Sequence, residues 1–123
     1  MKKDSDNAIV VKSKAFALRS ISIYRYLIDE EHEFVLSKQF LRSATSIGAN
    51  VKEAIRGQTS ADFGAKMNVA LKEASETEYW LELMQESTFI NVDDVEEMLK
   101  DCRELIKILT AIVKTTFENK KNY

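Results

Sequence analysis

Apolar residues recur at intervals of three and four along most of the chain, and this spacing predicts helices. Residues 38–56 follow a strict four–three spacing, and residues 61–85 keep the same spacing for about three heptads. The apolar positions are Phe40, Ala44, Ile47, Val51 and Ala54 in the first segment, and Phe63, Met67, Ala70, Ala74, Thr77, Leu81 and Met84 in the second. Each segment therefore presents one apolar face to a core.

Two further helices are expected, at residues 7–31 and 92–118. The first has a wide apolar band and ends in the polar run D-E-E-H-E at residues 29–33, which we interpret as a loop. The last begins with acidic residues, which the helix dipole favours near an N-terminus. Ser37, Ser60 and Asn91 are the expected N-caps, and Gly57 lies just past the second helix. The prediction is one all-α domain over residues 1–123, an up-down-up-down four-helix bundle.

Composition supports long helices with few connections. The chain has 123 residues, no proline and three glycines, whereas proteins built of strands and tight turns usually need both residue types. The apolar bands of the two terminal helices are wide for a small monomer. Tyr79 and Trp80 are adjacent, so they cannot both face one core. This surplus of apolar surface predicts a homo-oligomer, although a generous core with one exposed aromatic residue is the alternative.

The location expected from the sequence is the cytoplasm. Cys102 is the single cysteine, which fits a reducing compartment, and no apolar run approaches the length of a membrane span. The charge is unevenly spread: residues 1–58 carry a net +3, residues 59–105 a net −8 and residues 106–123 a net +3. One basic face could therefore meet an acidic face on another copy.

No cofactor, metal site or small-molecule substrate is expected, and we do not expect an enzyme. The one histidine, His32, falls in a predicted loop, and the carboxylate-bridged metal sites of helix bundles need two Glu-x-x-His pairs. Cys102 occupies an apolar stripe position, typical of a buried cysteine. The three glycines are scattered and form no phosphate-binding loop.

Polar residues beside the apolar stripes are the candidates for a structural polar cluster between the second and third helices. The candidates are Ser46, Asn50, Glu53, Ser75 and Glu78, with Ser43 on the same stripe. The alternative is a partly solvated face on which serine and asparagine bond to their own helix. A second candidate is a basic patch for RNA or DNA made by Arg42, Lys52 and Arg56, although an acidic chain argues against strong nonspecific nucleic-acid binding.

Residues 46–54 read S-I-G-A-N-V-K-E-A, and Ser75 and Glu78 lie three apart on the next helix. These motifs resemble the four-helix-bundle family that includes proteins encoded in intervening sequences of bacterial 23S rRNA genes, whose patterns are approximately S-I-P-x-N-I-A-E-G and G-S-x-x-E-x. The matching positions are Ser46, Ile47, Asn50, Val51, Glu53, Ser75 and Glu78. Gly48, Lys52, Ala54 and Ala74 depart from the family pattern.

The resemblance implies a cytoplasmic bacterial protein that forms a ring-shaped homopentamer and has no catalytic activity. It also implies kinship with the accessory variability protein of diversity-generating retroelements, a strongly basic relative that binds nucleic acid and a reverse transcriptase. This chain is acidic, so nucleic-acid binding does not transfer directly. The leading hypothesis is a non-enzymatic homo-oligomeric interaction scaffold whose protein or nucleic-acid partner is unknown. The alternative is an RNA- or DNA-binding accessory module.

Overall fold

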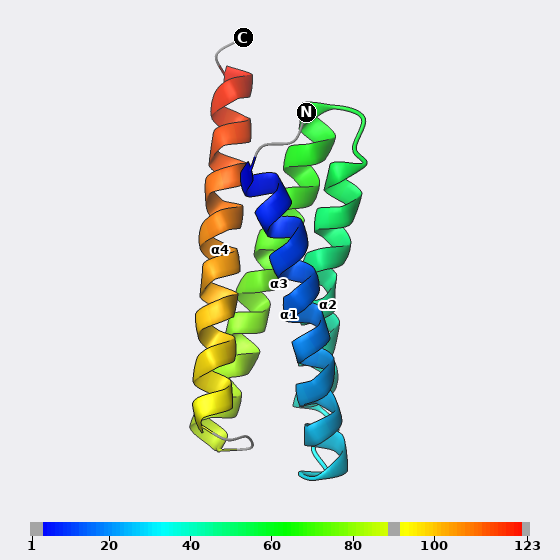
Figure 1. Cartoon of the computed structure of the whole chain (residues 1–123), viewed down its shortest axis with the longest axis vertical. Coiled ribbons are helices and arrows are strands. Elements are labelled where there is room, and N and C mark those ends of the chain that lie inside the picture. The colour runs from blue at the N-terminus through cyan, green and yellow to red at the C-terminus, as the bar shows by residue number, and fades with distance from the viewer. Residues whose placement is uncertain (1–3, 89–91, 122–123) are drawn as a thin grey trace.

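The computed structural model describes residues 4–88 and 92–121, and these residues form four α-helices and no strand. The helices are α1 (Asp4–Asp29), α2 (Leu36–Ile55), α3 (Ser60–Ser87) and α4 (Val92–Lys121) (Figure 1). The all-α, four-helix prediction is confirmed. Each predicted helix end lies within three residues of the observed one.

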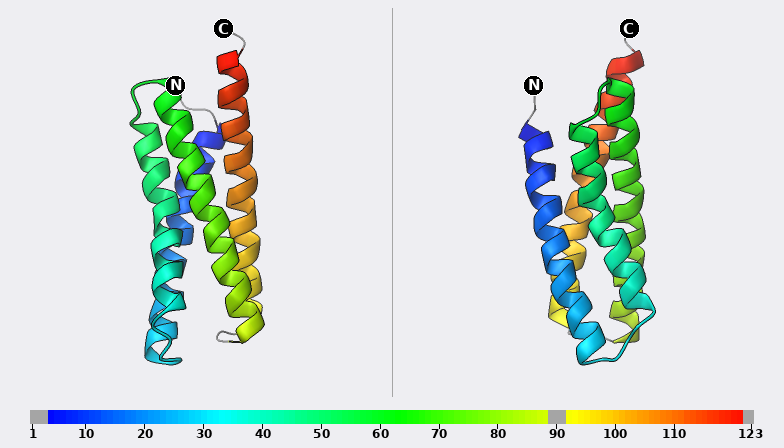
Figure 2. Two further views of the ribbon diagram at one scale, coloured as in Figure 1. Left: turned by 180° about the vertical axis from the view of Figure 1, so that it is seen from behind. Right: turned by 90° about the vertical axis from the view of Figure 1, so that its right-hand side faces the viewer.

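Each helix packs beside its neighbour in the chain, and α1 also lies against α4, more loosely (Figures 1 and 2). Partners on α2 and α3 show that these two helices run antiparallel: Arg42 pairs with Glu76, and Glu53, further along α2, pairs with the earlier Lys66. Between α1 and α4, Lys12 forms an ion pair with Glu104 at 2.9 Å.

The core is built from the stripes read in the sequence. All five predicted positions of α2 are buried, with exposed fractions of 1% or less. Of the predicted stripe on α3, Phe63 is half-buried, and the other six positions are buried: Met67, Ala70, Ala74, Thr77, Leu81 and Met84. Full burial of one large apolar side chain stabilises a fold by about 1.5–3 kcal/mol, so this shared core is what keeps the helices together.

The caps of α2 and α3 differ from the predicted ones. Ser37 lies inside α2, and the carboxylate of Glu33 instead accepts hydrogen bonds from the backbone N–H groups of Val35, Leu36 and Ser37. At α3 the cap is Thr59, whose hydroxyl accepts from the N–H of Asp62 at 3.0 Å. A capping group must lie where the free N–H groups of the first helical turn point. A shift of the helix start by one residue therefore changes which side chain can cap it. The predicted cap at Asn91 lies outside the described residues.

Glycines mark two close helix contacts of different tightness. A Cβ on Gly64 would meet the Thr116 side chain at 3.0 Å, so α3 and α4 approach closely there. A Cβ on Gly48 would meet Ser13 at 3.5 Å, which is ordinary contact, so α1 and α2 leave more room between them. Within the described residues, no helix is long and apolar enough to cross a membrane.

Candidate interaction surfaces

Three of the five residues predicted to form a polar cluster bond within their own helix. Ser46 donates to the carbonyl oxygen of Arg42 at 2.7 Å, and Asn50 donates to that of Ser46 at 2.8 Å. Ser75 donates to the carbonyl oxygen of Leu71 at 3.1 Å. This is the local bonding that serine and asparagine side chains make readily in helices.

The two predicted glutamates face different helices. Glu53 pairs with Lys66 of α3 at 3.0 Å, whereas Glu78 accepts from the guanidinium of Arg103 on α4 at 2.8 Å. The five residues therefore do not form one polar cluster between α2 and α3. The prediction was wrong on this point because spacing along one helix does not reveal which neighbour a polar stripe faces.

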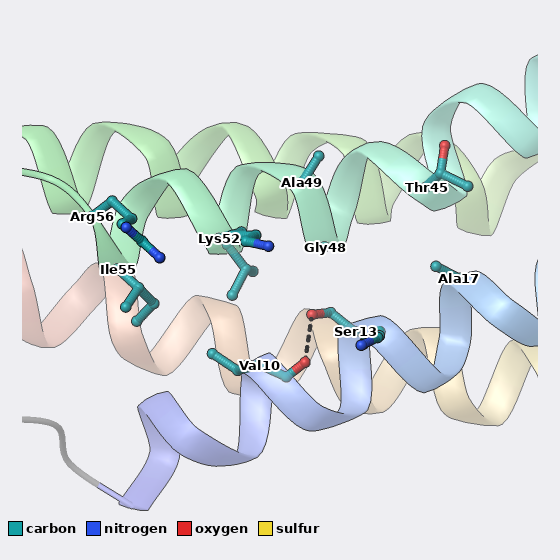
Figure 3. Close-up of a pocket in the computed structure, with 11 residues that line it drawn as sticks. Val10, Ser13, Ala17, Thr45, Gly48, Ala49, Lys52, Ile55 and Arg56 are labelled. Atoms are coloured by element: carbon teal, nitrogen blue, oxygen red, sulfur yellow. Dashed lines mark hydrogen bonds between the residues drawn. The ribbon is translucent and has the colours of Figure 1, made fainter.

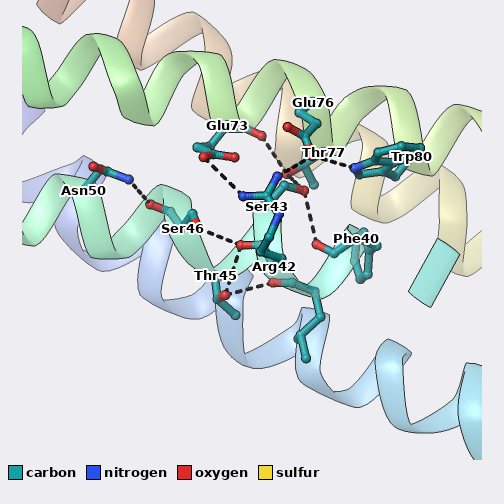
Figure 4. Close-up of polar contacts among 11 residues, drawn as sticks. Phe40, Arg42, Ser43, Thr45, Ser46, Asn50, Glu73, Glu76, Thr77 and Trp80 are labelled. Atoms are coloured by element: carbon teal, nitrogen blue, oxygen red, sulfur yellow. Dashed lines mark hydrogen bonds and ion pairs between the residues drawn. The ribbon is translucent and has the colours of Figure 1, made fainter. Parts of the chain in front are cut away.

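A different pair links α2 and α3. The hydroxyls of Ser43 and Thr77 lie 2.8 Å apart, and both residues are fully buried (Figure 4). Each hydroxyl also has a backbone acceptor within its own helix: the carbonyl oxygen of Phe40 for Ser43 and that of Glu73 for Thr77. A hydroxyl carries one proton and accepts others, so the pair satisfies both buried groups.

The predicted basic patch is divided by the structure. Arg42 lies against α3, with its guanidinium 2.6 Å from the carboxylate of Glu76 and 3.6 Å from that of Glu73 (Figure 4). Glu76 also accepts from the indole N–H of Trp80 at 3.0 Å. Desolvation raises the pKa of Glu76, but the bonds from Trp80 and Arg42 and the charge of Arg42 outweigh it, so the pKa is lowered. Arg42 is therefore neutralised within the fold.

Lys52 and Arg56 instead line a cleft between α1 and α2 of about 490 Å³. Its lining residues are mostly apolar or small, and Lys52 and Arg56 lie along it (Figure 3). Lys14 of α1 is a third cation in the lining. Ala17, Gly48 and Ala49 contribute little side-chain volume, which leaves the cleft open. Among the described residues, none of the three cations forms an ion pair. We call this surface the α1–α2 groove.

An exposed apolar stripe on α1 borders the groove. Val10, Val11, Leu18 and Ile21 are 36%, 68%, 58% and 38% exposed. Val10 and Ile21 lie at helical spacing in the wide apolar band that predicts this helix, but the fold leaves both exposed, so the band is wider than the core. Val10 belongs to both the stripe and the groove, so the two form one continuous surface.

A second exposed apolar surface lies on α3. Tyr79 is 53% exposed and Val69 is 40% exposed, while Trp80 is half-buried against the core. The rings of Tyr79 and Trp80 lie 5.2 Å apart between centroids. We call Val69, Glu76, Tyr79 and Trp80 the α3 outer face.

The single cysteine lies in the core. Cys102 is buried, its thiol lies 3.3 Å from the carbonyl oxygen of Ala74, and burial, with a smaller contribution from the charge of Glu78, raises its pKa to about 12. At neutral pH the thiol is therefore protonated, whereas the thiolate is the nucleophile. The part of the chain that the structure describes contains no group of three or more His, Cys, Asp or Glu side chains placed to bind a metal ion.

The fold defines an all-α four-helix protein with a groove between α1 and α2 and exposed apolar side chains on α1 and α3. The chain belongs to the 23S rRNA-intervening sequence protein family, whose model matches residues 5–111. It is also similar to a protein of unknown function from the S23 ribosomal protein family of Bacteroides thetaiotaomicron. The two chains are 49% identical, with a TM-score of 0.87, and the match covers 89% of this chain and 98% of the other. A comparison with curated proteins gave no match.

Two residues of these surfaces were not predicted from the sequence: Thr77, which bonds to Ser43, and Lys14, which lines the α1–α2 groove. Thr77 was read as one more position of an apolar stripe, although a hydroxyl there needs a partner when it is buried. Lys14 carried no signal of its own, because its place beside Lys52 and Arg56 depends on how α1 packs against α2.

Proposed function

We propose that the protein is a non-enzymatic interaction scaffold: an up-down-up-down bundle that assembles into a homo-oligomer, a ring of five copies. The observation that carries the proposal is the exposed stripe of four large apolar residues on α1, continuous with the α1–α2 groove. A monomer that left this surface in water would forgo the stabilisation that burial of apolar area provides.

A ring requires a head-to-tail interface, in which two different surfaces of the same protomer meet. The chain offers two such surfaces, the α1–α2 groove with its cations and the α3 outer face. Membership of the 23S rRNA-intervening sequence family supports this reading through the resemblance described above.

Size-exclusion chromatography with light scattering tests the assembly. We expect a mass of about 70 kDa at micromolar concentration, which is five times the 14.1 kDa of one chain. A mass of one chain at that concentration would contradict the proposal, and a stable mass of two or four chains would contradict the ring of five.

The non-enzymatic role and a bacterial cytoplasmic location are part of the same proposal. A buried thiol with a raised pKa is a poor nucleophile, which supports a structural role for Cys102. A single free cysteine fits a reducing compartment.

An RNA- or DNA-binding accessory module is the second candidate. It is favoured by Lys14, Lys52 and Arg56, three cations around one groove without ion-pair partners in the described structure. Arg42 is not part of this candidate surface, because Glu73 and Glu76 neutralise its charge. Binding of short single-stranded RNA that weakens steeply with salt would support the candidate, and no binding at low salt would remove it.

A further inference from the structure

We propose that the α1–α2 groove is the receptor for the α3 outer face of a second copy, with Tyr79 as the residue that enters the groove. The inference rests on the proposed homo-oligomer and names the two surfaces that meet in it. The occupant of the groove is thus α3 of a neighbouring copy of this same chain.

The groove has the space and the lining that an aromatic side chain needs. Ala17, Gly48 and Ala49 leave its middle open, and Val10 and Ile55 provide apolar contact (Figure 3). Ala49 is exposed, so its small side chain leaves space open on α2, whereas at Gly48 a Cβ would already contact Ser13 of α1 at 3.5 Å. A preformed apolar cleft of this kind is typical of binding sites for large side chains.

The α3 outer face has the matching composition. Tyrosine and tryptophan are enriched at interfaces, since they bury a large apolar area and keep a polar group at one end. The indole N–H of Trp80 already donates to Glu76, so covering this residue leaves no donor unpaired. Tyr79 projects from the same face and is more than half exposed.

Charge complementarity favours a second copy over an unrelated partner. The groove is bordered by Lys14, Lys52 and Arg56, whereas α3 carries six acidic residues and two lysines. Four of these acids share two arginines of the neighbouring helices, and Lys66 pairs with Glu53, so α3 keeps a net negative charge within the fold. Cations at the rim also interact favourably with the face of an aromatic ring. The opposite charges orient the two surfaces toward each other during encounter.

The two surfaces can be occupied at the same time. The groove lies between α1 and α2, and the outer face lies on α3, which packs against α2 and α4 but not against α1 (Figure 2). Each copy therefore has one receiving surface and one entering surface. This contact is heterologous and continues from copy to copy until a ring closes.

A mixing experiment tests the pairing. Ala49→Trp fills the groove and leaves α3 intact, and Tyr79→Lys places a cation opposite the cationic rim and leaves the groove intact. Both positions are exposed, so circular dichroism should show wild-type helix content. We expect each variant alone to have the mass of one chain, and an equal mixture to contain a dimer of about 28 kDa, twice 14.1 kDa, because one intact interface remains.

Val35→Lys is the matched control, since Val35 is 72% exposed but lies in neither surface, and it should keep the wild-type mass. An oligomeric wild type with both variants unchanged in mass would overturn this inference and leave the homo-oligomer standing. Variants that are monomeric alone and do not combine would overturn the head-to-tail pairing. A monomeric wild type would overturn the proposed function itself, and RNA binding by that monomer, abolished by Ala49→Trp, would assign the groove to nucleic acid.

Discussion

At the scale of single residues, Thr77 shows how a polar group can be part of an apolar stripe. Its position continues the four–three spacing of α3 and is fully buried, and its hydroxyl lies against that of Ser43 of α2. A leucine at either position would fill space without fixing how the helices are aligned. Because both buried hydroxyls need a partner, we expect the pair to define the register between α2 and α3 more narrowly than the surrounding apolar contacts do.

A double-mutant cycle tests this pair. Thr77→Val keeps the shape but removes the hydroxyl, and we expect a loss of about 1 kcal/mol in the free energy of unfolding; Ser43→Ala should cost about the same. The double variant should cost less than the sum, because replacing both partners leaves no buried group unpaired. Denaturant unfolding at one protein concentration measures the four values, and strictly additive costs would show that the hydroxyls do not interact.

Arg42 and Lys52 have different surroundings that could not be predicted from their sequence positions alone. Both are cations on the helix at residues 36–55, and the sequence gives them equal standing in a basic patch. Their difference comes from α3, which places Glu73 and Glu76 beside Arg42, while Lys52 faces the groove beside α1. That difference depends on how three helices pack together, and the spacing of residues within one helix does not predict this packing.

At the scale of elements, the start of α2 depends on Glu33. Desolvation would raise the pKa of this carboxyl, but hydrogen bonds from three backbone N–H groups and from Ser37 lower it. The folded chain therefore binds a proton at Glu33 less tightly than the unfolded chain does. The resulting stabilisation is present above the ordinary carboxyl pKa of 4.5 and is lost as the pH falls through the lower folded-state value.

Glu33→Gln tests this cap. We expect the variant to be less stable than the wild type by about 1 kcal/mol near pH 7, where a charged acceptor is replaced by a neutral one. The difference should shrink as the pH falls below the ordinary carboxyl pKa, because the wild-type carboxyl then becomes neutral too. Glu30→Gln, at an exposed position of the same loop, is the control. A difference that stayed constant with pH would contradict the role of the charge.

The helices were predictable from the sequence because their core stripes are regular, and their ends were less so. Phe40, Ile47 and Val51 are buried as the spacing predicts. The spacing could not show that Val10 and Ile21 on α1 stay exposed, because an apolar residue that faces a partner follows the same helical period as one that faces the core. Periodicity identifies an apolar face, and only the packed fold shows how much of that face the chain itself covers.

At the scale of the whole molecule, the uneven charge along the chain becomes an arrangement of surfaces. Three cations of the first half, Lys14, Lys52 and Arg56, line the α1–α2 groove, and α3 carries six of the twelve acidic residues between residues 59 and 105. Four of the six acids of α3 are paired within the bundle, Glu73 and Glu76 with Arg42 and Glu78 and Glu82 with Arg103. Each arginine is shared by two carboxylates, so α3 keeps a net negative charge that complements the groove of another copy.

If assembly covers the α1 stripe and the groove, thermal stability must depend on protein concentration. Association stabilises the folded chain by mass action, so we expect the Tm of the wild type to rise by a few degrees for each tenfold increase in concentration. Ala49→Trp and Tyr79→Lys should melt at a Tm independent of concentration, and Val35→Lys should behave like the wild type. Scanning calorimetry over a hundredfold range measures this. A wild-type Tm that does not move would show that the exposed surface of α1 is not buried between copies.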